Sequence, residues 1–149
     1  MLSLNLPAFN AKITEKDGKN FIFDILRHRY VALTPEEWVR QHFVHFLIDY
    51  KKYPSALMAN EVQIRLNGTQ KRCDTVLYRR DLTAQMIMEY KAPDIPIKQA
   101  VFDQITRYNM VMKVDYLIVS NGMQHYCCKM DYKQSHYIFL SDIPEYHSL

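Results

Sequence analysis

The chain has 149 residues, 48% hydrophobic and 23% charged, a composition that fits a single globular domain over residues 1–149 with a sizeable core. A net charge of +3 is too small to indicate nucleic-acid binding by itself, and three cysteines, an odd number, argue against a disulfide framework. No stretch approaches the ~20 apolar residues of a membrane span, and the N-terminus lacks a secretory pattern, so we expect a cytoplasmic protein without a membrane partner.

The first third of the chain predicts a short strand and a long helix. Residues 21–24 are mostly apolar and follow the Asp17-Gly18 turn, which indicates a strand. Thr34-Pro35-Glu36-Glu37 is typical of a helix start, with threonine as the N-cap and Glu37 completing a capping box. The helix should extend to about Lys51. The apolar residues expected on its inward stripe are Val39, Phe43, Phe46, Leu47 and Tyr50.

A β region follows this helix. Apolar and polar residues alternate over residues 62–66, and Asn67-Gly68 is a strong hairpin signal. Residues 71–78 should form the return strand and residues 84–91 a third strand. Pro93 follows that third strand and should end it, because proline cannot donate to a β-ladder.

The last third predicts one more helix and the remaining strands. Apolar residues recur with helical spacing over residues 97–112. Strands are expected at 116–119, 124–129 and 136–140, with Ser120-Asn121-Gly122 as the turn between the first two. This order predicts an α/β (α+β) fold in which a mixed central β-sheet is flanked by helices, with a crossover connecting strands 84–91 and 116–119.

The most informative residues are Glu89 and Lys91, with Asp74 fifteen residues upstream of Glu89. Residues two apart on a strand point to the same face, so an acid and an amine should project together from a strand end. Asp74 lies in the preceding strand and can join them. Taken singly, each acid has a simpler explanation: Asp74 can pair with a neighbouring arginine, and Glu89 with Lys91.

Two carboxylates and a lysine at one point favour a metal-dependent hydrolase of phosphodiesters. Mg²⁺ prefers oxygen ligands and retains water, and Mn²⁺ can substitute for it. The bound ion would lower the pKa of a water molecule, and Lys91 would orient that water or stabilise developing charge. Basic residues surround Asp74 and suit a polyanionic substrate, although they also fit a solvated hairpin. These are Arg65, Lys71, Arg72, Arg79 and Arg80.

With these motifs the chain resembles the PD-(D/E)xK nuclease superfamily, most closely the N-terminal nuclease domain of type I restriction enzyme R subunits and its small stand-alone relatives. The resemblance implies a restriction-endonuclease-like fold and Mg²⁺-dependent cleavage of DNA. It covers roughly residues 20 to 130. The matching segments are residues 33–41, Lys71-Arg72-Cys73-Asp74, Glu89-Tyr90-Lys91-Ala92-Pro93, residues 104–108 and Ser120-Asn121-Gly122.

The resemblance also implies roles for residues on the helices. Gln104 and Tyr108 fit the Q-x-x-x-Y element, because residues four apart share a helix face. The family places an acid on the first helix, and Glu36 is the choice because it falls near the inward stripe; Glu37 and Glu61 are alternates. The implied metal ligands are Asp74, Glu89 and Glu36, and the implied DNA contacts are Lys71, Arg72 and Arg107.

Two functional hypotheses remain open from the sequence. The first is a metal-dependent DNA endonuclease of the restriction type, and the alternative is a non-catalytic DNA- or protein-binding module of a restriction or defence complex. With only three glycines the chain has no P-loop, so an ATP-driven translocase would have to be a partner. The expected partners are DNA, other restriction–modification subunits and a second copy of the chain.

Overall fold

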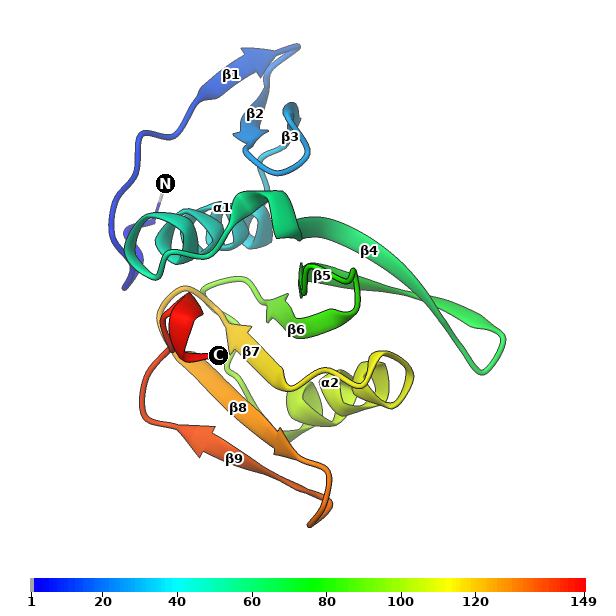
Figure 1. Ribbon diagram of the computed structural model, residues 1–149. Helices are drawn as coiled ribbons and strands as arrows, with labels where there is room; N and C mark the ends of the chain where they lie inside the picture. Colours follow the sequence, from blue (N-terminus) through cyan, green and yellow to red (C-terminus); the bar gives the residue numbers. More distant parts are fainter. Residues whose placement is uncertain (1) are drawn as a thin grey trace.

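The computed structural model describes residues 2–149, apart from the side chains of Leu66 and Tyr108, and shows two β-sheets and two α-helices (Figure 1). The smaller sheet contains β1 (Ile13–Lys16), β2 (Lys19–Asp24) and β3 (Arg29–Ala32). The larger sheet contains β4 (Met58–Leu66), β5 (Thr69–Tyr78), β6 (Ala84–Tyr90), β7 (Tyr116–Ser120), β8 (His125–Asp131) and β9 (His136–Leu140). The helices are α1 (Pro35–Tyr50) and α2 (Gln99–Met112), and short 3₁₀ turns cover Ser55–Leu57 and Tyr146–Ser148.

The larger sheet is mixed, as the sequence predicts. Its six strands lie in the order β4-β5-β6-β7-β8-β9, and only β6 and β7 run parallel. Parallel neighbours need a crossover, which α2 supplies. The predicted crossover between these two strands is therefore confirmed, and it fixes the carboxyl end of β6 beside that of β7.

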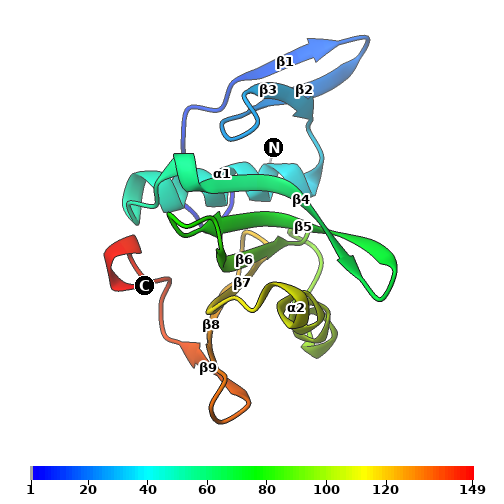
Figure 2. The ribbon, with the colours of Figure 1, turned by 45° about the vertical axis from the view of Figure 1, so that its right-hand side comes forward.

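The two helices cover opposite faces of the larger sheet (Figure 2). Alternate residues of β6 contribute to two separate apolar clusters: Met88 packs with Phe43 of α1, and Ile87 packs with Ile105 of α2. All four of these side chains are fully buried. A strand buried on both faces reads as a continuous apolar run, which accounts for the sequence of β6.

Helix α1 begins as predicted but is buried more widely than one stripe. The Thr34 hydroxyl accepts a 3.0 Å hydrogen bond from the Glu37 amide, which confirms the N-cap. The Glu37 carboxylate bonds to other side chains instead of closing a capping box. The expectation that Tyr50 faces inward is wrong, since it is 55% exposed. Trp38 and His42 pack against Phe9, so the N-terminal segment covers a further side of α1.

The three-stranded sheet was only partly predicted. The strand expected at 21–24 is present as β2, but β1 and β3 were not foreseen. Every residue of β1 is exposed, and three of the four residues of β3 are exposed. Such strands lack the apolar–polar alternation that indicates a half-buried strand. Within residues 2–149, no helix is long and apolar enough to cross a membrane.

Candidate active site

Asp74 and Glu89 lie side by side on adjacent antiparallel strands. The β5–β6 register pairs Thr75 with Met88, so the next residues outward are Asp74 and Glu89. The Tyr90 amide donates a 2.8 Å hydrogen bond to Oδ2 of Asp74, which anchors that carboxylate at the end of β6. Glu89 is only 4% exposed, whereas Asp74 is half-buried. The site is therefore a carboxylate pair with one buried and one more accessible member.

This placement makes Glu89 a perturbed acid. Burial raises its pKa well above the ordinary value, and the adjacent Asp74 carboxyl raises it further through its charge and a hydrogen bond. The charge of Lys91 acts in the opposite direction. Among the described side chains, Oε1 of Glu89 is one of two buried polar atoms without a hydrogen-bond partner, the other being Oε1 of Gln41. A buried carboxylate oxygen with no donor has spare capacity for a cation.

Lys91 joins the pair from the same strand end. Its amide donates a 2.9 Å hydrogen bond to the carbonyl of Ser120, which continues the β6–β7 pairing by one residue. The side chain is half-buried and two residues beyond Glu89, whose pKa it influences. The structure thus brings Asp74, Glu89 and Lys91 together at the carboxyl end of β6, as the strand pattern predicted.

The predicted position of the helix acid is wrong. Glu36 is exposed, whereas Glu37 is 5% exposed and points into the protein. Ideal helical spacing placed Glu36 on the apolar stripe, but of the two acids in the first turn of α1 only Glu37 is buried. The carboxylate of Glu37 accepts 3.0 Å hydrogen bonds from Arg27 and Arg40 and a 2.9 Å bond from Gln41. The buried acid of this helix is therefore fully engaged by neighbouring side chains.

Glu61, the other alternate, is also held by arginines. Its Oε1 accepts a 2.5 Å hydrogen bond from Arg40, and its Oε2 lies 3.3 Å from Nη1 of Arg72. Arg40 additionally donates a 2.8 Å hydrogen bond to the carbonyl oxygen of Asp74. Burial opposes the charge of Arg40, but the carboxylates of Glu37 and Glu61 raise its pKa, so the guanidinium stays charged.

The expected three-acid metal set is not assembled. In the part of the chain that the structure describes, no three His, Cys, Asp or Glu side chains form a group that could hold a metal ion. Asp74 and Glu89 remain as the carboxylates available to a cation, because Glu37 and Glu61 are paired with arginines and Glu36 is exposed. Carboxylate oxygens and the unpartnered Glu89 Oε1 nevertheless fit a hard divalent cation completed by water.

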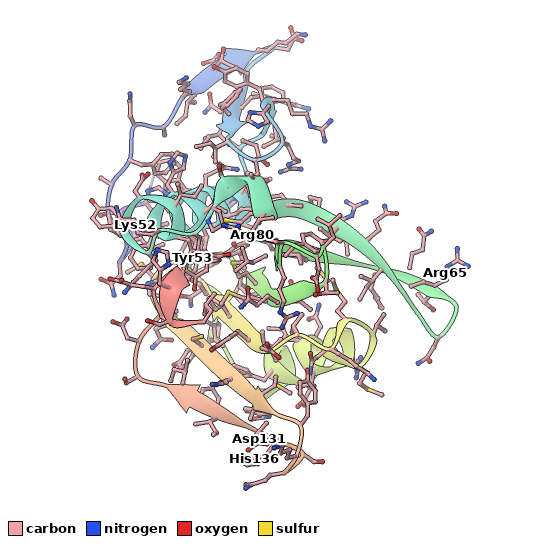
Figure 3. The ribbon with its side chains drawn as sticks, in the orientation of Figure 1. Lys52, Tyr53, Arg65, Arg80, Asp131 and His136 are labelled. Atoms are coloured by element: carbon pink, nitrogen blue, oxygen red, sulfur yellow. The ribbon has the colours of Figure 1, made fainter. Side chains whose placement is uncertain are left out.

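The other predicted residues lie on α2 and on the β4–β5 hairpin. Gln104 is half-buried on α2 and Arg107 is exposed, while the side chain of Tyr108 lies outside the described residues. Lys71 and Arg72 are exposed on β5, where they line a polar hollow of about 290 Å³ with two glutamines. Figure 3 shows Arg65 near the tip of the same hairpin, pointing away from the protein.

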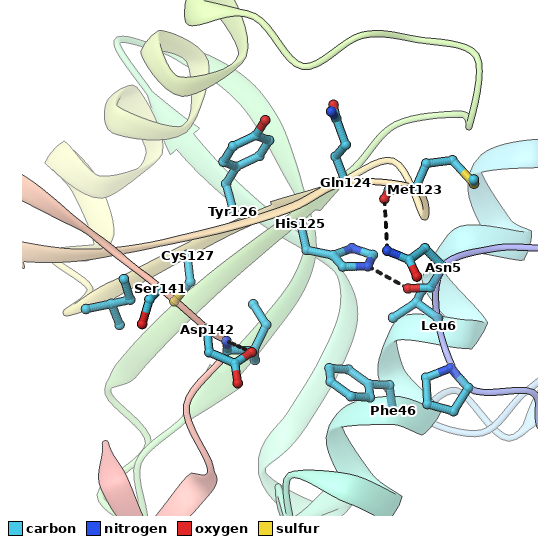
Figure 4. A pocket seen from close by; sticks show the side chains of 13 residues that line it. Asn5, Leu6, Phe46, Met123, Gln124, His125, Tyr126, Cys127, Ser141 and Asp142 are labelled. Atoms are coloured by element: carbon cyan, nitrogen blue, oxygen red, sulfur yellow. Dashed lines mark hydrogen bonds between the residues drawn. The ribbon is translucent and has the colours of Figure 1, made fainter.

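A cavity of about 400 Å³ lies elsewhere, between the N-terminal segment, β8 and the C-terminal segment (Figure 4). His125 lines it, but both ring nitrogens are engaged, with the carbonyl of Asn5 at 2.9 Å and the hydroxyl of Ser120 at 2.7 Å. Cys127 also lines it, and burial raises the pKa of this thiol to about 12. Neither side chain is poised as a nucleophile or base, so the carboxylate pair is the better candidate site.

Sequence reasoning missed Arg40. A charged residue on a helix is by default assigned to the solvated face, and here Arg40 is 8% exposed. One signal was available: Glu37 and Arg40 are three apart, a spacing at which helical side chains interact. That spacing indicates an ion pair but does not indicate that the pair is buried.

The protein has a mixed sheet with a helix on each face, and its carboxylate–lysine cluster lies at the carboxyl end of β6, one of the two parallel strands. These features define the restriction-endonuclease-like class. The structure superposes with a TM-score of 0.54 and 20% identity on a fragment described as an HsdR subunit of a type I restriction enzyme from Vibrio vulnificus YJ016. The match covers 76% of this chain and 24% of that one, so the chain spans about a quarter of its length. The predicted fold is confirmed.

Residues 35–144 match the family described as type I restriction enzyme R protein N terminus, and the chain belongs to that family. A weaker similarity, with a TM-score of 0.44 and 18% identity, relates 73% of the chain to 11% of a chain in the DrdV–DNA complex solved by cryo-electron microscopy. No curated protein sequence matches the chain.

Proposed function

We propose that this chain is a Mg²⁺-dependent deoxyribonuclease domain that hydrolyses phosphodiester bonds in DNA. The observation that carries the proposal is the unpartnered Oε1 of buried Glu89, beside the carboxyl of Asp74. Placing the Asp74 carboxyl beside buried Glu89 raises the free energy of the empty site with Glu89 ionised, because the charge of Asp74 disfavours ionisation of Glu89. A divalent cation bound between the two carboxylates would offset the repulsion between their charges, so the arrangement is consistent with a metal site.

Asp74 and Glu89 would hold Mg²⁺, or Mn²⁺ in its place. When bound, such an ion lowers the pKa of a coordinated water molecule and neutralises charge on the phosphate. Glu89 has a raised pKa, so it must give up its proton to act as a ligand. The main-chain amide of Lys91, which follows β6, is bonded to Ser120 of β7. The side chain of Lys91 would orient the attacking water or stabilise negative charge on the phosphate oxygens.

The substrate and partners follow from the same proposal. Lys71, Arg72 and Arg107 are exposed and would contact the DNA backbone, and Gln104 and Tyr108 would complete the site from α2. The domain would act in the cytoplasm with other restriction–modification subunits, including an ATP-driven translocase. A second copy of the chain would allow both strands to be cut.

The test is a cleavage assay on single- and double-stranded DNA with Mg²⁺, Mn²⁺ or EDTA. We expect metal-dependent cleavage by the wild type and none by Lys91→Ala, with circular dichroism showing that the variant is folded. Lys129→Ala is the matched control, because this exposed lysine lies over the Tyr116 ring on β7 and outside the carboxylate cluster. Equal cleavage by wild type and Lys91→Ala would refute the proposal.

A second candidate is a non-catalytic binding module of a restriction or defence complex. It is favoured by the absence, among the described side chains, of a third acid beside Asp74 and Glu89. Titration calorimetry separates the two candidates, because a pure binding module has no need of the cation. Binding of DNA without measurable binding of Mg²⁺ or Mn²⁺ would support this second candidate.

A further inference from the structure

Arg40 connects helix α1 to the strand that carries Asp74. Its side chain is 8% exposed, and Nη1 donates a 2.8 Å hydrogen bond to the main-chain oxygen of Asp74. The β4–β5 register skips Asp74 and the residue opposite it, Glu61, which has a left-handed φ of 59°. Arg40 therefore bonds to a carbonyl at a point where the β-ladder is interrupted.

The orientation of Arg40 is set by two acids. Its Nε and Nη2 donate to the two oxygens of Glu37, each at 3.0 Å, and Nη2 also donates to Glu61 at 2.5 Å. Such a bidentate pair fixes the plane of the guanidinium, which a single charge–charge contact does not. The third nitrogen, Nη1, is thereby aimed at Asp74.

Asp74 is consequently held at two atoms from two directions. Its main-chain oxygen is bonded by Arg40 on α1, and its carboxylate is bonded by the Tyr90 amide on β6. A shift of the main chain at Asp74 would displace the carboxylate from both Tyr90 and Glu89. The position of the carboxylate therefore depends on the helix as well as on the sheet.

We propose that Arg40 is a positioning residue that sets where Asp74 presents its carboxylate to Glu89. Glu37 and Glu61 act as counter-ions that orient Arg40, and they do not ligate the metal. The inference rests on the proposed nuclease function for what Asp74 is positioned to do. The contacts that carry it involve no metal, so it can be tested without one.

The experiment compares Arg40→Lys with Arg27→Lys by hydrogen exchange of the Tyr90 amide. Both arginines bond to Glu37, but the bonds from Arg27 go to Glu37 and Asp24 and not to Asp74. Lysine keeps the charge and loses the forked donors. We expect Tyr90 exchange to accelerate about tenfold in Arg40→Lys, as for the loss of one charge-assisted hydrogen bond, and less than about twofold in Arg27→Lys.

The amide of Ile118, in the centre of the sheet, reports whether the fold is intact and should exchange at the wild-type rate in both variants. Unchanged Tyr90 exchange in Arg40→Lys, or equal acceleration in the two variants, would overturn the inference. If Arg40→Lys does not fold, the double variant Arg40→Met/Glu37→Met replaces it, because removing both buried charges is better tolerated than removing one.

Calorimetry with Mn²⁺ supplies the readout that a purely structural role would not move. We expect an approximately tenfold weaker affinity in Arg40→Lys and no loss in Arg27→Lys. If the wild type neither binds metal nor cuts DNA, the proposed function fails while Tyr90 exchange still decides the role of Arg40. If the wild type binds and cuts but the two variants behave alike, only the inference about Arg40 fails.

Discussion

The Tyr90 amide bonds to the side chain of Asp74, at 2.8 Å from Oδ2. The β5–β6 ladder pairs main chain with main chain up to Thr75 and Met88, and at the next step a carboxylate supplies the acceptor. The same group thus ends the ladder and forms half of the candidate metal site. Substitutions of Asp74 should therefore separate its structural role from its chemical one.

Asp74→Asn should preserve the fold and abolish metal binding. The asparagine oxygen can still accept from the Tyr90 amide, but the negative charge beside Glu89 is gone. At a pH where Glu89 is ionised, we expect the metal-free variant to gain on the order of 1 kcal/mol in free energy of unfolding, because the charge of Asp74 no longer repels that of Glu89. Urea denaturation measures the gain and calorimetry the lost Mn²⁺ binding. Asp74→Ala, which also removes the acceptor, should be less stable than Asp74→Asn, and the reverse order would contradict this role.

The contribution of Glu89 to the stability of the metal-free protein should fall as the pH rises from about 4.5 toward neutrality. Its pKa is raised in the folded state, so the folded protein binds this proton more tightly than the unfolded chain. The stabilisation is complete below the unfolded pKa and is lost as the pH rises through the folded one, with a slope of at most ~1.4 kcal/mol per pH unit.

Urea denaturation of wild type and Glu89→Gln across this pH range isolates the contribution of Glu89, since the other titrating groups are common to both proteins. The difference between the two free energies of unfolding should change steadily with pH. A difference that is flat from pH 4.5 to neutrality would show that the pKa of Glu89 is not raised.

Lys71→Ala and Arg107→Ala should each weaken DNA binding at all sequences to a similar extent. Both side chains are exposed, and a phosphate contact contributes affinity through release of counterions. Each substitution should reduce the slope of log affinity against log salt by about 1. Fluorescence anisotropy at several salt concentrations measures this slope. Lys19→Ala is the matched control, because Lys19 is exposed on β2, away from the β4–β5 hairpin (Figure 1).

The three cysteines should be inert to thiol reagents while the protein is folded. Burial raises the pKa of Cys73 and Cys127 to about 12 and that of Cys128 to about 11. Because the thiolate is the reactive form, labelling at pH 8 should be slow in buffer and complete in urea. Rapid labelling of the native protein would mean that at least one of these strands is accessible.

The strands of the larger sheet and the two helices that cover it could be predicted because the sequence patterns that indicate them are local. The Asn67-Gly68 turn, the Thr34 N-cap and the apolar run before Glu89 each indicate an element without knowledge of its neighbours. The spacing of Glu89 and Lys91 also predicted that they lie at one strand end, because side chains alternate between the two faces of a strand in any fold. These patterns were sufficient to bring Asp74, Glu89 and Lys91 to one place.

The helix acid could not be predicted in the same way. The stripe rule assumes that a helix has one buried face, but α1 lies between the three-stranded sheet and the larger sheet (Figures 1 and 2). Glu37 is buried because Arg27, which follows β2, reaches it with a 3.0 Å hydrogen bond. Nothing in the local sequence around Glu37 reveals a partner ten residues upstream, in the turn between β2 and β3.

The three-stranded sheet precedes residue 35, where the family similarity begins, yet it is bonded into the matched region. Asp24, at the end of β2, is fully buried and accepts two hydrogen bonds from the side-chain amide of Asn60, whose oxygen accepts from Thr75. A boundary drawn by sequence similarity would cut through this chain of polar contacts. The part of the chain that folds together with the matched region therefore includes Asp24, which lies before residue 35.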